Sequence, residues 1–260
     1  TSSTGHAVDH PDMAEAEFVY GGGFLAPIMG NTIINLGNGR IFNSFAGSCN
    51  ADILGHTETY IGRQPKGDGT YEEGFPWIRD HVYGGNDLGG KILGDSNFVS
   101  RVNSTILDQV YNPQSKSPPD VTKASSYMEY VQGRVDNIFG GCYGDYDYKD
   151  DYYSTYFYDN GNAKPGFTKP RMSNAFVNFR PNSNNRNAVS NIFGAGQGHT
   201  LDGDRDVMQD RSYVLVDIPQ SLETYVNTQV FGAGEACGVG MRNGAAIGAA
   251  YQELSPEITK

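Results

Sequence analysis

One acidic stretch, Leu201-Asp-Gly-Asp-Arg-Asp206, has the residue spacing of a metal site. Its carboxylates Asp202, Asp204 and Asp206 stand at alternate positions around a glycine, as the oxygen ligands of calcium loops often do. The residue at the twelfth loop position is Tyr213 instead of a bidentate Glu, which excludes an EF-hand. We therefore expect no required cofactor, with calcium as the one candidate, because a solvated acidic loop explains the same composition.

A second stretch, residues 143–158, is rich in tyrosine. Exposed phenol rings beside carboxylates suit sugar recognition, because the ring face covers C–H surface while phenols and carboxylates bond hydroxyls. A pair of strands whose aromatic rows pack on the outside of the fold explains the same composition. The candidate ligand-binding residues are Tyr143, Tyr146, Tyr148, Tyr152, Tyr153, Tyr156 and Tyr158, and the neighbouring acidic cluster is Asp145, Asp147, Asp150 and Asp151.

Acid–base catalysis would need converging carboxylates, or carboxylates beside a Lys or Arg. Asp87, Lys91, Arg134 and Asp136 lie near glycine-rich turns. Each is equally explained as a polar residue on a solvated strand face. No motif joins these residues, so the sequence assigns no catalytic residue.

The three cysteines, Cys49, Cys142 and Cys237, each follow a glycine-rich turn at a short distance. We interpret them as small buried residues beside turns. A single Cys142–Cys237 bridge is the alternative that the sequence leaves open, although nothing in the spacing indicates it. The sequence lacks a C-x-x-C pair, which argues against zinc. His6-Ala-Val-Asp-His10 has the spacing of helical metal ligands, but the flanking glycine and proline disfavour a helix.

The stretch Val230-Phe-Gly-Ala-Gly-Glu-Ala-Cys-Gly238 imitates the glycine turn of a dinucleotide-binding site. The same Phe-Gly-Ala-Gly occurs at 193–196 without a helical pattern after it. The chain also ends too soon after residue 238 for a complete βαβ unit. The hypothesis of a dinucleotide-binding site is therefore disfavoured, and the glycines require a structural explanation.

That explanation is a repeated phrase in which an apolar residue and an aromatic precede a pair of small residues. Residues 20–30 align without a gap on residues 45–55, an offset of 25 residues, and Ile28/Ile53 and Thr32/Thr57 fall in register. A fixed period of this length predicts stacked repeats. The five copies begin at Val19, Val82, Ile138, Ile192 and Val230.

Runs between the glycines, such as 32–36, 175–179 and 213–218, are short and rich in β-branched and aromatic residues, which predicts strands. We therefore expect an all-β parallel β-helix in which aromatic, isoleucine and threonine residues stack in ladders. Glycines are expected to supply positive φ where one strand turns into the next. The expected surface loops are 63–76, 111–125, 143–170 and 197–210.

We expect residues 1–260 to form a single β-helix domain that is a mature or excised part of a longer chain. Residues 1–17 and 241–260 are candidate N- and C-terminal caps, and 245–254 is expected to form a short helix or a last turn. The formal net charge of −11 argues against nucleic acid and anionic membranes as partners. No apolar run approaches ~18 residues, so no membrane-spanning segment is expected.

Three motifs carry a resemblance to a known family: Val19-Tyr-Gly-Gly-Gly23, Gly30-Asn-Thr-Ile-Ile-Asn-Leu-Gly37 and Val82-Tyr-Gly-Gly-Asn-Asp-Leu-Gly-Gly90. The chain resembles the glycine-rich repeat proteins of the surface or secretions of gut Bacteroidetes over 18–62, 82–94, 135–144 and 189–240. The resemblance implies a right-handed parallel β-helix of the pectin-lyase-like type, an extracellular or cell-surface location and a role in adhesion.

Two function classes remain. The first is a non-enzymatic surface or secreted module, with loops that bind a glycan or a protein. The second is a carbohydrate-active enzyme, a lyase or a glycoside hydrolase, because the β-helix scaffold resembles that of many polysaccharide-degrading proteins. The acidic balance disfavours a grip on polyuronates, and the binding module is the leading hypothesis.

Overall fold

The structure is a computed structural model that describes residues 14–66, 68, 70–94, 125–146, 158–159, 162–164, 170–198, 208–237, 239, 241–242, 245–246 and 250–254. All regular secondary structure among these residues is β-strand, which confirms the prediction of an all-β chain. Two large sheets, A and B, are built from parallel pairings.

Sheet A has six strands in the order β1-β3-β7-β10-β15-β18: β1 (Glu15–Tyr20), β3 (Arg40–Phe45), β7 (Trp77–Tyr83), β10 (Arg134–Phe139), β15 (Asn185–Phe193) and β18 (Thr224–Phe231). Sheet B has seven: β2 (Thr32–Leu36), β4 (Thr57–Ile61), β9 (Ser126–Tyr130), β14 (Arg171–Phe179), β17 (Met208–Val216), β21 (Ala250–Leu254), and β8 (Lys91–Ile92) beside β14.

The short strands form pairs outside these sheets. Three pairs are antiparallel: β5 (Arg63–Pro65) with β6 (Tyr71–Glu73), β12 (Tyr158–Asp159) with β13 (Asn162–Ala163), and β19 (Met241–Arg242) with β20 (Ala245–Ala246). One pair is parallel: β11 (Tyr143–Gly144) with β16 (Gln197–Gly198).

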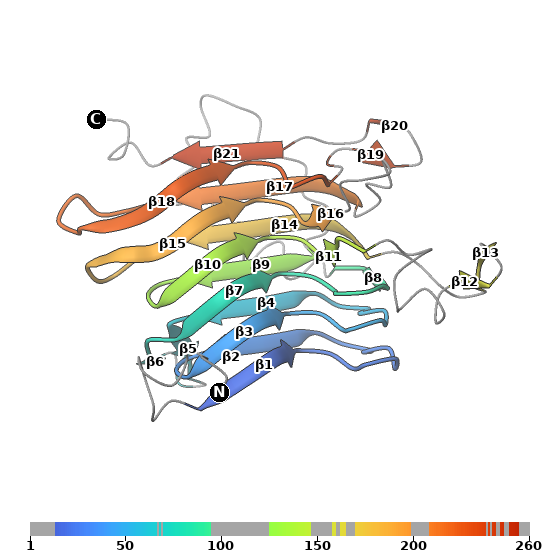
Figure 1. Ribbon diagram of the computed structural model, residues 1–260, viewed down its shortest axis with the longest axis horizontal. Helices are drawn as coiled ribbons and strands as arrows, with labels where there is room; N and C mark the ends of the chain where they lie inside the picture. The colour runs from blue at the N-terminus through green and yellow to red at the C-terminus, as the bar shows by residue number, and fades with distance from the viewer. Residues whose placement is uncertain are drawn as a thin grey trace, which may run out of the picture.

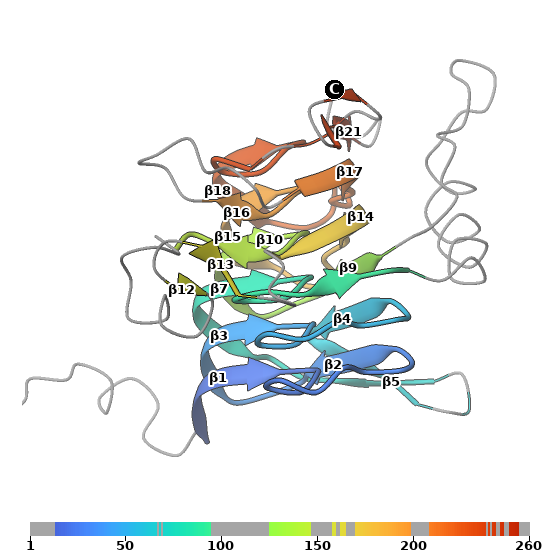
Figure 2. The same cartoon turned by 90° about the vertical axis from the view of Figure 1, so that its right-hand side faces the viewer.

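The long strands fall alternately in sheet A and sheet B along the chain. Figure 1 shows their layers following one another from β1 at one end of the stack to β21 at the other, and Figure 2 shows the two sheets on opposite sides. The main apolar core lies between the sheets, since it joins Ile138 and Ile192 of sheet A to Met128 and Val214 of sheet B. Burial of this shared face holds the layers together.

The register predicted from the 25-residue offset is confirmed. Thr32 pairs with Thr57 in sheet B, and Ile28 bridges Ile53 in parallel. A third, shorter parallel ladder continues from Ile53 to Ile92, and β8 extends it to β14. Equivalent positions of neighbouring layers therefore lie directly beside each other.

The aromatic residues of the repeated phrase form one continuous stack at the ends of the sheet A strands. Successive ring centroids are 4.6 to 5.1 Å apart with interplanar angles of 4° to 12°, which is the offset-stacked range. This stack belongs to an apolar cluster separate from the main core. Its members are Tyr20, Phe45, Tyr83, Phe139, Phe193 and Phe231.

The glycines that follow these aromatic residues are required for a different reason from the one predicted. Gly84, Gly140 and Gly194 lack left-handed φ angles. A Cβ on Gly140 would instead overlap the carbonyl oxygen of Gly194 in the next layer. The phrase therefore keeps glycine because the backbones of adjacent layers approach closely. Among the described residues, the glycines with left-handed φ angles are Gly39, Gly62, Gly90, Gly94 and Gly133.

Several segments expected as loops or as a helix contain strands. The loop 63–76 holds the hairpin β5–β6, and the loop 143–170 holds β11, β12 and β13. The loop 197–210 holds β16 and the start of β17, because Met208 pairs with Arg171 of β14. The helix expected within 245–254 is wrong for Ala250–Leu254, where pairing with β17 overrides helix propensity.

Candidate functional site

The outward face of sheet B carries rows of polar and aromatic side chains. Thr59, Met128 and Val177 are in register, and Met128 and Val177 belong to the main core. Side chains alternate along a strand, so the neighbouring positions Glu58, Tyr60, Tyr127, Glu129, Phe176 and Asn178 point to the other side of the sheet. All six are buried.

Two buried carboxylates on this face are each held by a tyrosine. Oε2 of Glu129 accepts a hydrogen bond of 2.9 Å from Tyr127, and its Oε1 accepts one from Arg63. Glu58 accepts from Tyr60 at 2.5 Å and lies 2.8 Å from Nε2 of His56. The network satisfies charges that would otherwise be costly to bury.

The Tyr127 phenol is further fixed by Asn178, which donates a hydrogen bond of 3.1 Å to it. Burial, and after it the nearby Glu129 carboxylate, raise the pKa of Tyr127 well above its usual value. Tyr127 therefore stays protonated at neutral pH and acts as a donor to Glu129.

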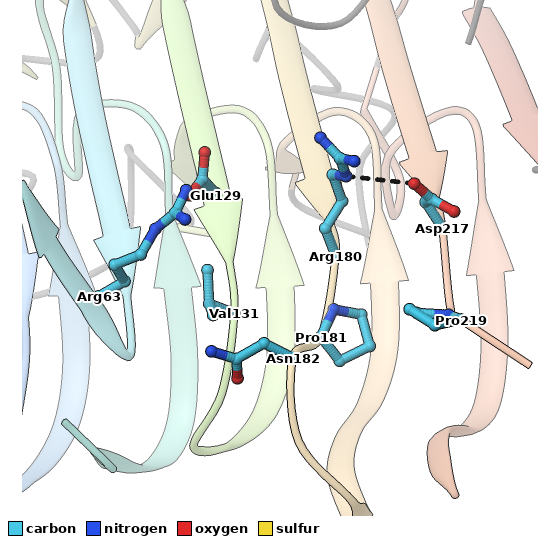
Figure 3. Close-up of a pocket in the computed structure, with 8 residues that line it drawn as sticks. All are labelled: Arg63, Glu129, Val131, Arg180, Pro181, Asn182, Asp217 and Pro219. Carbon is cyan, nitrogen blue, oxygen red and sulfur yellow. Dashed lines mark hydrogen bonds and ion pairs between the residues drawn. The ribbon is translucent and has the colours of Figure 1, made fainter. Parts of the chain in front are cut away.

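A hollow of about 270 Å³ opens at the edge of this network. Figure 3 shows Arg63 reaching Glu129 at one side of it and Arg180 facing Asp217 at the other. Nε of Arg180 donates to Oδ2 of Asp217 over 3.1 Å. The remaining lining residues are Val131, Pro181, Asn182 and Pro219.

The ends of three sheet B strands position these residues. The amides of Val131, Arg180 and Asp217 continue the ladder by donating to Ile61, Tyr130 and Phe179 respectively. Pro181 and Pro219 follow, and proline has no amide hydrogen to extend a ladder. The chain therefore leaves the sheet just beyond the row that lines the hollow.

The hairpin β5–β6 holds the guanidinium group of Arg63 in place. The guanidinium carbon of Arg63 lies 3.9 Å from the ring centroid of Tyr71, a cation–π distance. Nδ2 of Asn182 donates a hydrogen bond of 3.0 Å to Glu73 of the same hairpin. The first contact fixes Arg63 within the hairpin, and the second ties the hairpin to Asn182 at the rim of the hollow.

Two buried polar atoms, one at the hollow and one beside it, lack a hydrogen-bond partner in the described part of the chain. The two atoms are Nε of Arg63 and Oδ1 of Asn178. Buried polar atoms in native proteins are normally satisfied by protein, water or ligand. Arg63 lines the hollow itself, and Asn178 lies next to Glu129 in register.

Two of the predicted ligand-binding tyrosines lie in a second polar cluster. Tyr146 donates 2.7 Å to Oδ1 of Asp87, and Tyr20 donates 2.7 Å to Oδ2. Tyr143 packs against Tyr146 and Tyr83, with ring centroids 4.9 and 5.1 Å away. Both phenol rings are half-buried.

Other predicted residues are distributed as follows. The backbone of Tyr158 lies in β12, whereas Tyr148, Tyr152, Tyr153, Tyr156, Asp202, Asp204 and Asp206, as well as His6 and His10, lie outside the described residues.

The four acid–base candidates lie at separate places. Lys91 is exposed on β8. Arg134 and Asp136 are exposed on β10 and line a hollow that Asp87 does not line. The structure does not bring these four acid–base candidates together.

No disulfide joins Cys49, Cys142 and Cys237. Cys49 and Cys142 are buried, as the sequence predicts, whereas Cys237 is only partly buried. Among the described residues, no three His, Cys, Asp or Glu side chains are arranged to hold a metal ion. The described residues also include no helix of the length and apolar character needed to cross a membrane.

Sequence reasoning missed Arg63, Glu129, Arg180 and Asp217. Arg63 falls in a segment expected to be a loop, and Glu129 belongs to a strand whose register is set across a long insertion. The available signal is position: Arg180 and Asp217 each directly follow a β-rich run and directly or closely precede a proline.

Comparisons with known protein families, with curated proteins and with solved structures give no match to this chain. The arrangement of the described residues is therefore the basis for a functional proposal.

Proposed function

We propose that the chain is a non-enzymatic binding module built on a right-handed parallel β-helix, and that the hollow beside Glu129 binds a glycan. Three features support the β-helix. The long strands alternate between two parallel sheets, equivalent residues stack between layers, and a third short ladder runs through Ile28, Ile53 and Ile92.

The observation that carries the glycan proposal is the pairing of charges around the hollow. Arg63 is paired with Glu129, and Arg180 with Asp217. The four groups sum to zero charge while presenting both donors and acceptors. Hydroxyl groups can donate and accept, so a neutral, hydroxyl-rich ligand matches this lining better than an ion does.

The size of the hollow is consistent with part of a longer ligand. Pockets that enclose drug-sized molecules usually have about 300–1,000 Å³, and this hollow has about 270 Å³. A short stretch of a glycan chain would fit there, with the remainder lying outside the hollow.

The experiment is a screen of neutral oligosaccharides followed by calorimetric titration of the best ligand. The double variant Arg180→Ala/Asp217→Ala removes donors and acceptors but keeps the net charge. We expect its affinity to fall by roughly tenfold or more, because hydrogen bonds to charged groups contribute about 1.5–3 kcal/mol each.

The matched control is Arg186→Ala/Glu223→Ala. This pair is exposed, with side chains 71% and 61% accessible, and it does not line the hollow. It should leave the affinity unchanged. Equal losses in both variants, or no neutral glycan bound by a correctly folded sample, would contradict the proposal.

One observation favours a second candidate, a glycoside hydrolase. Glu129 and Asp217 line the same hollow, and glycoside hydrolysis uses two carboxylates that flank the scissile bond. Release of reducing ends from a polysaccharide, abolished by Glu129→Gln and by Asp217→Asn in folded protein, would replace the binding proposal by this one.

The extracellular or cell-surface location is part of the proposal. It is supported by the resemblance of Val19-Tyr-Gly-Gly-Gly23 and related motifs to surface and secreted repeat proteins. A protein ligand in place of a glycan is a further outcome that the screen distinguishes, since it would leave all oligosaccharides without effect.

A further inference from the structure

The outer face of sheet A carries an arginine–tryptophan stack. Arg40, Trp77 and Arg134 are direct neighbours on β3, β7 and β10. The guanidinium carbons of Arg40 and Arg134 lie 5.4 and 5.0 Å from the Trp77 ring centroid, and that of Arg79 lies 6.0 Å away. These are cation–π distances, so the ring holds three guanidinium groups close together.

A hollow of about 310 Å³ lies over this stack. It is separate from the hollow beside Glu129, because the two share no lining residue. Its polar lining consists of Arg79, Arg134, Asp136, Asn187, Ser190 and Asn227.

The two hollows differ in charge. Arg79 and Arg134 face a single lining carboxylate, Asp136, so this hollow has a formal charge of one positive unit on a chain with a net charge of −11. Oδ2 of Asp136 accepts a hydrogen bond of 3.1 Å from Asn137, which partly satisfies the one anion. A local positive charge on an acidic protein marks a place where a negatively charged ligand is favoured.

A row of side-chain amides lies on the same strands as residues that line the hollow. Nδ2 of Asn191 donates 2.7 Å to Oδ1 of Asn137, and Nδ2 of Asn137 lies 3.0 Å from Nδ1 of His81. These contacts cross β7, β10 and β15, the strands that present Trp77, Arg134 and Ser190. The polar groups around the hollow are therefore held by paired strands rather than by a loop.

We propose that this hollow binds the carboxylate of an acidic saccharide. Arg79 and Arg134 would contact the carboxylate, since guanidinium groups match its geometry. Asn187, Ser190 and Asn227 would bond the sugar hydroxyls. The inference rests on the proposed function for the ligand being a glycan, but its site and its charge preference are independent of the hollow beside Glu129.

Trp77 provides a direct readout, because it is the single tryptophan in the chain. We expect its fluorescence to change on titration with oligogalacturonate. The fully methyl-esterified oligomer, and acetate at the same carboxylate concentration, should give no comparable change. Raising the salt from about 50 mM to about 500 mM should weaken the binding, because salt screens exposed charges.

Calorimetry then places the ligand, since a substitution beside Trp77 also alters the baseline fluorescence. Arg134→Ala should lower the affinity for oligogalacturonate by roughly tenfold. The charge-matched control Lys91→Ala removes an exposed cation elsewhere and should have no effect. Asn187→Ala, at an exposed position, should weaken binding too and serves as the second variant if Arg134→Ala fails to fold.

Three results would overturn the inference. These are an equal response to the methyl ester or to acetate, unchanged affinity in folded Arg134→Ala or Asn187→Ala, and loss of acidic-ligand binding in Arg180→Ala/Asp217→Ala but not in Arg134→Ala. Failure of the neutral-glycan proposal alone would leave the oligogalacturonate response intact, so the two failures are distinguishable.

Discussion

The phenol of Tyr146 donates a hydrogen bond of 2.7 Å to the buried carboxylate of Asp87, across 59 residues of sequence. Tyr20 donates to the other oxygen of the same group, and the Cys49 thiol lies 3.9 Å from it. Burial raises the pKa of Asp87 from 3.8 to about 6, and the hydrogen bonds from Tyr20, Tyr146 and Cys49 offset part of that rise.

The raised pKa of Asp87 predicts stability that depends on pH. The folded state binds a proton at Asp87 more tightly than the unfolded state does. The resulting stabilisation is complete below about pH 4 and is lost as the pH rises through 6. A change from 3.8 to about 6 corresponds to about 3 kcal/mol.

The measurement is urea unfolding of the wild type and of Asp87→Asn between about pH 4 and pH 7.5. Because Asn does not titrate, the difference between the two proteins isolates Asp87. The wild type should gain about 3 kcal/mol relative to the variant as the pH falls. A difference independent of pH would show that the carboxyl is not held as described.

The tyrosines of this cluster should not contribute to that pH dependence. Burial, and after it the Asp87 carboxylate, raise the pKa of Tyr20 and Tyr146 above the usual value. Burial, and after it nearby Tyr143, raise that of Tyr83 in the same direction. All three phenols therefore remain protonated throughout the range tested.

The thiols should be unreactive in the native protein. Burial raises the pKa of Cys49 and of Cys237 to about 12 each, and it raises the pKa of Cys142 as well. The thiolate is the reactive form. A thiol reagent at about pH 8 should therefore label the folded protein slowly, whereas all three cysteines should react in guanidinium. Rapid labelling of the native protein would contradict this burial.

The sequence anticipates contacts that repeat and misses those that occur once. The pairing of Tyr20 with Phe45 follows from aligned phrases, because stacking one layer on the next forces equivalent residues together. The contact of Arg63 with Glu129 joins residues 66 apart that share no motif. Its position depends on the register between β4 and β9, which the long segment between them conceals.

The same limit applies to Asp87 and Tyr146. Each residue is noticeable in the sequence, one near a turn and the other in a tyrosine-rich stretch, but nothing in the spacing pairs them. The sequence also does not show why the repeated phrase contains glycine, because a left-handed φ and a close backbone approach both select glycine. Close approach selects glycine at position 140, whereas a left-handed φ selects it at Gly39.

Close approach makes Gly140 intolerant of any side chain. A Cβ there would overlap the Gly194 carbonyl oxygen, a backbone atom that cannot rotate away. We expect Gly140→Ala to destabilise the fold by about 3 kcal/mol or more. Gly30→Ala is the control, because nothing lies within 4 Å of its Cβ position, and it should change stability by less than about 1 kcal/mol. Similar melting temperatures for both variants would show that adjacent layers are not in close contact.

The ion pair of Arg63 and Glu129 should contribute far more to stability than that of Arg186 and Glu223. Glu129 is buried, so its removal leaves the Tyr127 phenol and part of Arg63 without their partner. Breaking a buried pair from one side typically costs about 3–5 kcal/mol. Because Arg63 is partly solvated, we expect about 3 kcal/mol for Glu129→Ala.

The matched variant Glu223→Ala should cost less than about 1 kcal/mol, since exposed ion pairs contribute little. Both values come from urea unfolding at neutral pH in low salt and again at high salt. Salt should reduce the small Glu223 effect and leave most of the Glu129 effect, because buried charges are screened less. Equal costs for the two variants would mean that the Glu129 network is solvated, and the hollow beside it would then lack a fixed wall for a ligand.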